Sequence, residues 1–342
     1  MTQLLDHLAD LTALRDRDGL DTALVATLQE LLHPNSIGIY RLVGPLNNEH
    51  WLTCAQISNG VTQHQARQAW AELDELPRAD EFAHRQKAMN SRQPVTTENP
   101  TTNVFPLTTE NASGGVLELC SAAPMSAETH RLVCAVLRLY QNFQSLLDYG
   151  ERDALTELLN RKTFDGAFLK ATTDQHEPPE LGTNDRRQGR PGGSYWLAML
   201  DIDHFKRVND NFGHLIGDEV LLLLARLMRS SFRFHDQLYR FGGEEFVVLM
   251  HCMQAGQAEV AMERLRSITE QFSFPQVGRI TVSIGFTEIR RGDSPSSALE
   301  RADKAVYYAK AQGRNQVHDH EVLVAQGKLA AVAVNVGDIE LF

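Results

Sequence analysis

The chain contains no apolar run long enough to cross a membrane. Its longer apolar stretches, such as residues 220–225 and 329–334, fall far short of the roughly 18–20 residues that a spanning helix needs. The first residues also lack a basic segment followed by an apolar one, so no secretory signal peptide is predicted. We therefore expect a cytoplasmic protein without a membrane span.

Cysteine and positive charge are both scarce. The four cysteines (Cys54, Cys120, Cys134 and Cys252) lie far apart and form no Cys-x-x-Cys pair, so we expect reduced thiols. Lys and Arg number 33 against 44 Asp and Glu, which gives a formal net charge of −11. Nucleic-acid binding needs clustered cations, so we expect no DNA partner. A small anionic ligand held by a few local cations stays compatible with this composition.

The 342 residues are enough for two domains, and the first half mixes helical and strand patterns. The order of these helical and strand segments along the chain predicts an antiparallel sheet with helices packed on it. The last two strands are expected to form a hairpin. Helices are predicted over 1–33 and 62–90, and strands over 36–44, 51–57, 94–98, 104–110 and 115–120.

A long helix is predicted over residues 126–160. Apolar residues recur in it at alternating spacings of four and three, namely Leu132, Val136, Leu139, Phe143 and Leu146. This is a heptad pattern over about two heptads, and a firm coiled coil needs three or four. Two interpretations therefore stay open: the face packs on its own domain, or it pairs with the same helix of a second copy.

The second half follows the order β-α-β-β-α-β-α after a loop over 172–194 that is rich in Pro, Gly and charge. Its tail, from residue 318 onward, has no pattern that indicates a role. Strands are predicted over 195–203, 237–250 (a hairpin) and 279–289, and helices around 220–228, 256–272 and 296–312.

Acidic residues fall at two strand ends in this half. Asp201 and Asp203 alternate onto one face at the end of an apolar strand, and Glu244 and Glu245 follow the hairpin turn. Mg²⁺ prefers a few carboxylate oxygens together with substrate phosphates, so a cation site is one interpretation. A helix cap at Asp203 and a solvated turn is the other. Adjacent strand residues face opposite ways, so at most one glutamate would share a metal with Asp201.

Two further features are compatible with a nucleotide. Gly242 and Gly243 separate two β runs, which predicts a tight primed turn whose backbone a ligand can approach closely. Lys310 and Arg314 are four residues apart, one helical turn, near the end of a helix that Gly313 would cap. They would either clamp a triphosphate or complement the helix dipole.

Together, four motifs resemble the GGDEF family of diguanylate cyclases. They are DALTELLNRKTF (153–164), DIDHFKRVNDNFGHLIGDEVL (201–221), RFGGEEF (240–246) and ADKAVYYAKAQGRNQV (302–317). The resemblance covers about residues 153–317, nearly half of the chain. It implies an α/β palm similar to that of nucleotide cyclases and polymerases, so the expected fold class is α/β (α+β) overall.

The resemblance also implies roles for individual residues. Asp201, the backbone carbonyl of Ile202, and Glu244 would bind one or two Mg²⁺ (or Mn²⁺). Glu245 would accept a proton, and Lys206 would lie on the phosphates and stabilise the transition state. The implied substrate-binding positions are His204, Phe205, Asn209, His214, Asp218, Gly242, Gly243, Lys310 and Arg314. A carboxylate at Asp218 can accept hydrogen bonds from guanine N1–H and the 2-amino group, so GTP would be preferred over ATP.

The implied reaction joins two GTP into cyclic di-GMP with loss of two pyrophosphates. Since one domain holds one GTP, the active species would be a homodimer, and the heptad face would hold the two domains together. Arg233 and Asp236 match the family's RxxD inhibitory site, which implies feedback by the product. An Arg at a helix end followed by a loop Asp is the plainer interpretation of that tetrapeptide.

The N-terminal part resembles a GAF domain, most clearly over residues 105–133. GAF domains are small-molecule or light-sensing modules, so an unknown small-molecule ligand is implied. His50, His64 and His84 lack metal-ligand spacing, so we do not expect haem or zinc. The expected organisation is a sensory domain (1–125), a connecting helix (126–152), a GGDEF domain (153–318) and an extension (319–342).

Two other functions compete with the enzyme. The chain could be a catalytically silent receptor that binds cyclic di-GMP through Arg233 and Asp236, or a GAF-driven regulator that acts through a protein contact. The intact acidic and glycine positions favour the enzyme.

Overall fold

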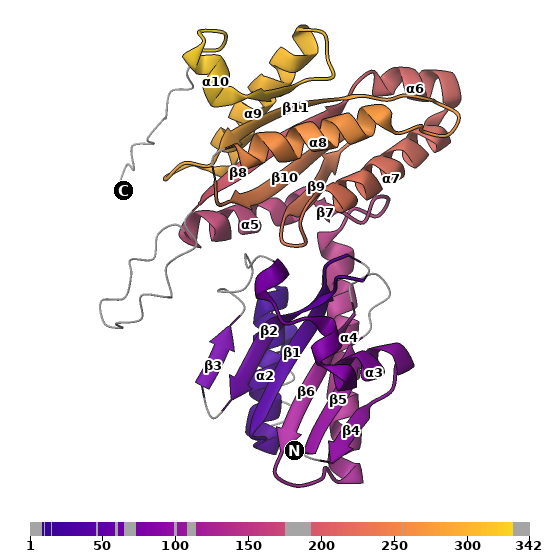
Figure 1. Ribbon diagram of the computed structural model, residues 1–342, viewed down its shortest axis with the longest axis vertical. Helices are drawn as coiled ribbons and strands as arrows, with labels where there is room; N and C mark the ends of the chain where they lie inside the picture. The colour runs from indigo at the N-terminus through magenta and orange to yellow at the C-terminus, as the bar shows by residue number, and fades with distance from the viewer. Residues whose placement is uncertain are drawn as a thin grey trace. The chain divides into compact units, whose positions relative to one another are not determined.

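The computed structural model divides into two compact units, Met1–Gly150 and Glu151–Phe342. Figure 1 shows the two units, each built around its own sheet. No helix in the described part of the chain is both long and apolar enough to cross a bilayer. The structure describes residues 9, 11–14, 16–45, 47–58, 61–64, 73–98, 101–107, 114–174, 193–254 and 256–330.

The first unit contains a six-stranded sheet in which all neighbours pair antiparallel, in the order β3-β2-β1-β6-β5-β4 (Figure 1). The predicted antiparallel sheet and the β5–β6 hairpin are thus confirmed. The strands are β1 (Ser36–Val43), β2 (His50–Ser58), β3 (Val61–His64), β4 (Val95–Glu98), β5 (Thr101–Leu107) and β6 (Gly115–Ser121).

The helix predicted over residues 62–90 is wrong for most of the residues in that range that the structure describes. Residues 61–64 are strand β3, which pairs with β2, and the α-helix α3 covers only Ala83–Ser91. Two short 3₁₀ turns, Leu73–Glu75 and Ala79–Glu81, precede it. Residues 65–72 lie outside the described residues. The apolar pattern in this stretch is weak, and its first residues form a strand because they pair with the neighbouring strand β2.

Helices α2 (Arg17–Leu32) and α4 (Ala127–Glu151) share one apolar core with the sheet. The polar side chains between them are also paired inside the core. Tyr140 of α4 donates a hydrogen bond to Asp21 of α2, and Arg41 of β1 donates two to the same carboxylate at 2.8 and 3.1 Å. Because a buried charge is tolerated only when it is paired, this cluster fixes α4 against the first unit.

The heptad face of α4 is partly buried in its own domain and partly exposed, so it is compatible with packing there and with pairing to a second copy. Val136 is buried in the core of the first unit, whereas Leu139 and Leu146 are 48% and 66% exposed. The predicted end of the helix at residue 160 is wrong, because α4 ends at Glu151. Asp153 then accepts hydrogen bonds from the backbone N–H and the hydroxyl of Thr156, which forms a turn in place of further helix.

The second unit holds a mixed six-stranded sheet in the order β12-β11-β8-β10-β9-β7. The four central strands pair antiparallel, and β7 and β12 add parallel edges. This confirms the α/β class. The strands are β7 (Leu159–Asn160), β8 (Ser194–Ile202), β9 (Gln237–Gly242), β10 (Glu245–Cys252), β11 (Val282–Glu288) and β12 (Val317–Asp319).

Two of the helices, α8 and α9, follow their predicted ranges to within one residue. Helix α7 begins at His214, well before the predicted range of 220–228, and α5, α6 and α10 were not predicted. Of the loop expected over 172–194, residues 172–174 close α5 and Ser194 begins β8, while residues 175–192 lie outside the described residues. The helices are α5 (Arg161–Asp174), α6 (Phe205–Phe212), α7 (His214–Ser231), α8 (Gln257–Gln271), α9 (Pro295–Ala311) and α10 (His320–Ala325).

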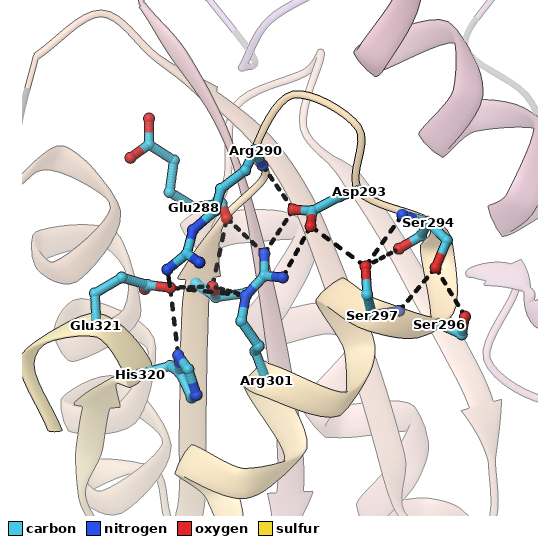
Figure 2. Close-up of polar contacts among 10 residues, drawn as sticks. Glu288, Arg290, Asp293, Ser294, Ser296, Ser297, Arg301, His320 and Glu321 are labelled. Atoms are coloured by element: carbon cyan, nitrogen blue, oxygen red, sulfur yellow. Dashed lines mark hydrogen bonds and ion pairs between the residues drawn. The ribbon is translucent and has the colours of Figure 1, made fainter. Parts of the chain in front are cut away.

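A buried guanidinium holds the start of α9 to the sheet. Arg301, which is 3% exposed, donates two hydrogen bonds to Asp293 at 2.9 and 2.6 Å. It also donates to the hydroxyl of Thr287 on β11. As Figure 2 shows, it donates as well to the carbonyl of Glu288 on the same strand. The Arg301 hydrogen bonds hold the pKa of Asp293 below its usual range, although burial acts in the opposite direction.

The start of the extension docks on this same cluster. Glu321 of α10 accepts hydrogen bonds from Thr287 at 2.7 Å and from Arg290 at 2.8 Å (Figure 2). Its neighbour His320 is buried. Residues 317–325 therefore belong to the folded unit as β12 and α10, a role that the sequence did not indicate; residues 331–342 lie outside the described residues.

Replacing Arg301 by Met should lower the free energy of unfolding by about 3 kcal/mol at pH 7, because Asp293 would keep a buried charge without its partner. The carboxylate with a lowered pKa stabilises the fold above pH 4 and loses that contribution as the pH falls. The gap between R301M and wild type should therefore shrink in acid. Hydrogen exchange of the α9 amides at increasing urea, at neutral and at acid pH, measures both the loss of unfolding free energy and its dependence on pH. An R290A control, at an exposed ion pair, should cost less than about 1 kcal/mol.

Candidate active site

The hairpin between β9 and β10 carries an open turn. Gly242 pairs with Glu245, so the two loop residues are Gly243 and Glu244, one position later than predicted. Gly243 has φ 53° and Glu244 does not have positive φ, which is the type II′ pattern. A Cβ on either glycine would meet no atom within 4 Å. The turn is therefore primed and open, as predicted, but Glu244 lies in the turn rather than on a strand.

Strand pairing brings the predicted acidic residues to one edge of the sheet. Asp201 near the end of β8 lies opposite Glu245 on β10 and opposite Ser283 on β11. Burial raises the pKa of Asp201 above its usual range, although an ion pair with Lys310 at 2.7 Å opposes the rise. Burial also raises the pKa of Glu244, and the charge of Asp201 raises it further. Strand pairing thus places Asp201 opposite Glu245, the neighbour of Glu244 in sequence, and the charges of Asp201 and Glu244 repel each other.

This pair fits a divalent cation. The Oδ1 atom of Asp201 is buried and accepts no hydrogen bond within the described structure. An unpaired carboxylate oxygen beside a second, repelled carboxylate is stabilised by a bound cation. Among the described residues, no three Asp, Glu, His or Cys side chains form a cage for a metal. Mg²⁺ characteristically uses one or two carboxylates and takes its other ligands from water and substrate phosphates.

Asp203, which the sequence paired with Asp201, has a different role. It is buried and accepts hydrogen bonds from the hydroxyls of Thr281 and Ser283, both at 2.7 Å, and from the backbone N–H of Asn315 at 3.0 Å. Asn315 in turn donates to Glu270 of α8. Asp203 therefore joins β8, β11 and the segment after α9, and its oxygens are already used.

The end of α9 places the two predicted cations. Gly313 has φ 115°, and the N–H of Arg314 donates to the carbonyl of Ala309, which is the bond of a Schellman cap. The predicted cap at Gly313 is thus confirmed. It leaves Lys310 on the helix, paired with Asp201, and places Arg314 directly after the helix end.

The predicted guanine-side residues lie on α6 and α7, which pack together. Phe205 is buried, whereas Lys206, His214 and Asp218 are exposed. The carboxamide of Asn209 occupies the space that a Cβ on Gly217 would need. The missing side chain at Gly217 therefore sets the position of Asn209, a packing relation that the sequence did not reveal.

His204 begins α6 with a left-handed φ of 60°. It lies with Arg207 and Arg279 at a cavity of about 260 Å³ beside α6. A smaller cavity of about 80 Å³ lies at the acidic edge. Its polar lining is Asp201, Glu245, Asp303, Tyr307 and Lys310.

Arg240 is a site residue that the sequence analysis did not single out. Its guanidinium donates to the carbonyl of Gly243 at 2.9 and 3.2 Å and to the carboxylate of Asp153 at 3.0 Å. It therefore ties the open turn to the turn that follows α4. Its position inside the RFGGEEF motif was the available signal, but the contact is between residues far apart in sequence.

Arg233 and Asp236 form a turn before β9. The carboxylate of Asp236 accepts a hydrogen bond from the backbone N–H of Arg233 at 2.9 Å, and the N–H of Asp236 donates to the carbonyl of Arg233. Arg233 itself is exposed. The plainer interpretation, a loop Asp, thus accounts for the carboxylate, while the guanidinium stays at the surface.

Comparison with known families identifies the second unit. Residues 151–316 match the family described as diguanylate cyclase, GGDEF domain, so the C-terminal half carries a GGDEF domain. No GAF match accompanies it, and the first unit is described by its fold alone. The match covers just under half of the chain.

Curated relatives each match about half of the chain. Diguanylate cyclase DgcP of Pseudomonas aeruginosa is 44% identical over 178 residues, which are 51% of this chain and 25% of that protein. Diguanylate cyclase VdcA of Vibrio cholerae is 36% identical over 171 residues, which are 48% of this chain and 45% of that protein. The chain thus spans less than half the length of these two relatives.

Solved structures of similar proteins also match about half of this chain. The GGDEF domain of DgcB from Caulobacter crescentus in complex with c-di-GMP is 34% identical, with a TM-score of 0.44, and the match covers 50% of this chain and 96% of that one. The active GGEEF domain of a diguanylate cyclase from Vibrio cholerae is 29% identical, with a TM-score of 0.40, over 48% of this chain and 97% of that one.

The two strand-end aspartates should respond differently to the same substitution. Asp203→Asn should cost about 2–3 kcal/mol of unfolding free energy, because an amide nitrogen would face a hydrogen-bond donor. Asp201→Asn should change stability by less than about 1 kcal/mol, because burial already disfavours the charge of Asp201. Urea unfolding of both variants checks this. A D201N protein as unstable as D203N would contradict the assignment.

Proposed function

We propose that this protein is a diguanylate cyclase that condenses two GTP into cyclic di-GMP and two pyrophosphates. One observation carries the proposal: Asp201, which has an unpaired buried oxygen and an ion pair with Lys310, lies opposite Glu245, directly after the open glycine turn that carries Glu244. Paired carboxylates and a lysine at an accessible turn suit a metal-bound triphosphate. The GGDEF match of the second unit supports this chemistry.

In this proposal Asp201, the carbonyl of Ile202, and Glu244 hold one or two Mg²⁺ or Mn²⁺. A metal held there would polarise the α-phosphate and would lower the pKa of the attacking hydroxyl. Lys206, Lys310 and Arg314 hold the phosphates, and Lys310 exchanges its ion pair with Asp201 for the triphosphate. The proton of the attacking hydroxyl passes to the carboxylate of Glu245.

Guanine recognition is assigned to α6 and α7. Asp218 accepts hydrogen bonds from N1–H and the 2-amino group, and Asn209 and His214 contact the same nucleotide. His204, Phe205, Gly242 and Gly243 complete the substrate contacts through the backbone and through packing. Adenine lacks the matching pair of donors, so selectivity for GTP follows.

The active species is proposed to be a homodimer joined through α4. Leu139, Leu146 and Tyr149 are 48%, 66% and 88% exposed, at spacings of seven and three. This is a narrow apolar stripe on a helix whose other face packs in the first unit. A second copy of the stripe would cover it and bring two domains, each with one GTP, to high local concentration.

The first unit is proposed as a GAF-like sensor of a small molecule that regulates the cyclase. The antiparallel sheet with α2 and α4 on one face supports this, since α4 runs from the sensor core to the GGDEF domain. Product feedback is proposed at Arg233 and Asp236, where the exposed guanidinium suits phosphate and guanine edges.

The second candidate is a silent receptor of cyclic di-GMP. The exposed Arg233 is compatible with it, but a receptor needs neither the unpaired oxygen of Asp201 nor the open turn. We therefore favour the enzyme.

The purified chain with GTP and Mg²⁺ should form cyclic di-GMP and pyrophosphate, measured by chromatography. Asp201→Asn and Glu245→Gln should each lower kcat at least a hundredfold, because a metal ligand and the proton acceptor are lost. Glu263→Gln, at an exposed ion pair of α8, should leave kcat unchanged. Tight binding of cyclic di-GMP without its formation would reject the enzyme in favour of the receptor.

Arg233→Ala should raise the concentration of cyclic di-GMP that halves activity by at least tenfold, because a charge-assisted fork to the ligand is removed. Arg226→Ala, which removes an exposed arginine of α7, should leave that concentration unchanged. Initial rates at increasing product measure both. Identical inhibition curves for R233A and wild type would remove the feedback site from the account.

A further inference from the structure

The small cavity at the acidic edge has a second wall that the proposed machinery does not use. Asp303 and Tyr307 of α9 line it together with Glu245, Asp201 and Lys310. Asp303, Tyr307 and Lys310 follow one another at spacings of four and three, so they share one face of the helix. The chain therefore presents an acid and an aromatic ring beside the proposed proton acceptor.

Neither residue is explained by packing. Tyr307 is 73% exposed although its ring lines the cavity, while the residues that α9 uses for the core, such as Ala305 and Ala309, are buried. Asp303 is exposed too, yet its charge acts on Asp201. An exposed tyrosine and an acid near an already repelled carboxylate pair add nothing evident to stability.

The size of the cavity restricts what can enter it. A hollow of about 80 Å³ is small and is lined by carboxylates, a phenol and an ammonium group, so it suits a polar, hydroxyl-bearing part of a ligand. The proposed guanine contacts, Asn209 and Asp218, are not among its lining residues. A hydroxyl-bearing group from a second molecule is therefore the occupant that suits it.

We propose that Asp303 and Tyr307 receive the ribose of the second GTP and position its 3′-hydroxyl at Glu245. This inference rests on the proposed function and adds the subsite for the attacking nucleotide. The ring of Tyr307 packs against the apolar face of the sugar, and Asp303 accepts a hydrogen bond from the 2′-hydroxyl. The 3′-hydroxyl gives its proton to Glu245, and O3′ bonds to the α-phosphorus of the first GTP. The bond from that phosphorus to the bridging oxygen breaks, and pyrophosphate leaves.

The test compares GTP with 2′-deoxy-GTP in the full chain. Asp303→Asn should lower kcat with GTP about tenfold and should reduce the preference for GTP over 2′-deoxy-GTP by a similar factor, because the 2′-hydroxyl loses its charged acceptor. Tyr307→Ala should lower kcat/KM at least tenfold, and Tyr307→Phe should restore most of it. Lys304→Gln, at an exposed ion pair on the same helix, is the matched control and should behave as wild type.

The outcomes separate the two levels of the account. A wild-type protein that forms no cyclic di-GMP overturns both the proposed function and this subsite. An active wild type with an unchanged 2′-deoxy preference in D303N, or with wild-type kinetics in Y307A, overturns the subsite alone. Urea unfolding of each variant identifies a loss of fold, and a destabilised D303N that keeps the wild-type preference also counts against the subsite.

Discussion

The proposed active site is built on one electrostatic conflict, because it holds two carboxylates of which neither is fully compensated. Asp201 is half-buried near the end of β8, with one oxygen paired to Lys310 and the other unpaired, and Glu244 adds a second charge within reach. Burial and repulsion raise the pKa of both groups. A fold optimised for stability alone would avoid this arrangement, and a bound cation with an anionic substrate would relieve it.

Other contacts in the second unit fix the segments that carry Asp201 and Lys310. Asp203, two residues away, uses its oxygens for three hydrogen bonds that join β8, β11 and Asn315. The Asn315 contact fixes the segment that carries Arg314, and the buried pair of Arg301 and Asp293 fixes the opposite end of α9. Rigid supports on both sides allow Lys310 to meet Asp201 at a defined distance.

The sequence predicted the strand ends, the primed turn and the helix cap at Gly313, because each depends on local chemistry. It placed the turn one residue too early, because the pairing of Gly242 with Glu245 is decided by the strand register. It also extended the connecting helix past Glu151, since it did not include the turn that Asp153 forms with Thr156.

Contacts between distant segments could not be predicted in the same way. Asp201 and Asp203 look alike in sequence, and only their partners on β11 and α9 separate a candidate ligand from a structural acid. The link from Arg240 to Asp153 and the exposed wall of Asp303 and Tyr307 likewise depend on the tertiary arrangement. Such contacts carry no periodicity that a single sequence can show.

The most direct measurement is the position of a bound metal ion. Crystals grown with Mn²⁺ and a non-hydrolysable GTP analogue should show an anomalous peak within bonding distance of Asp201 and Glu244, with Lys310 turned from Asp201 to the phosphates. An anomalous peak elsewhere, or a nucleotide bound with the ion pair of Lys310 and Asp201 intact, would contradict the account.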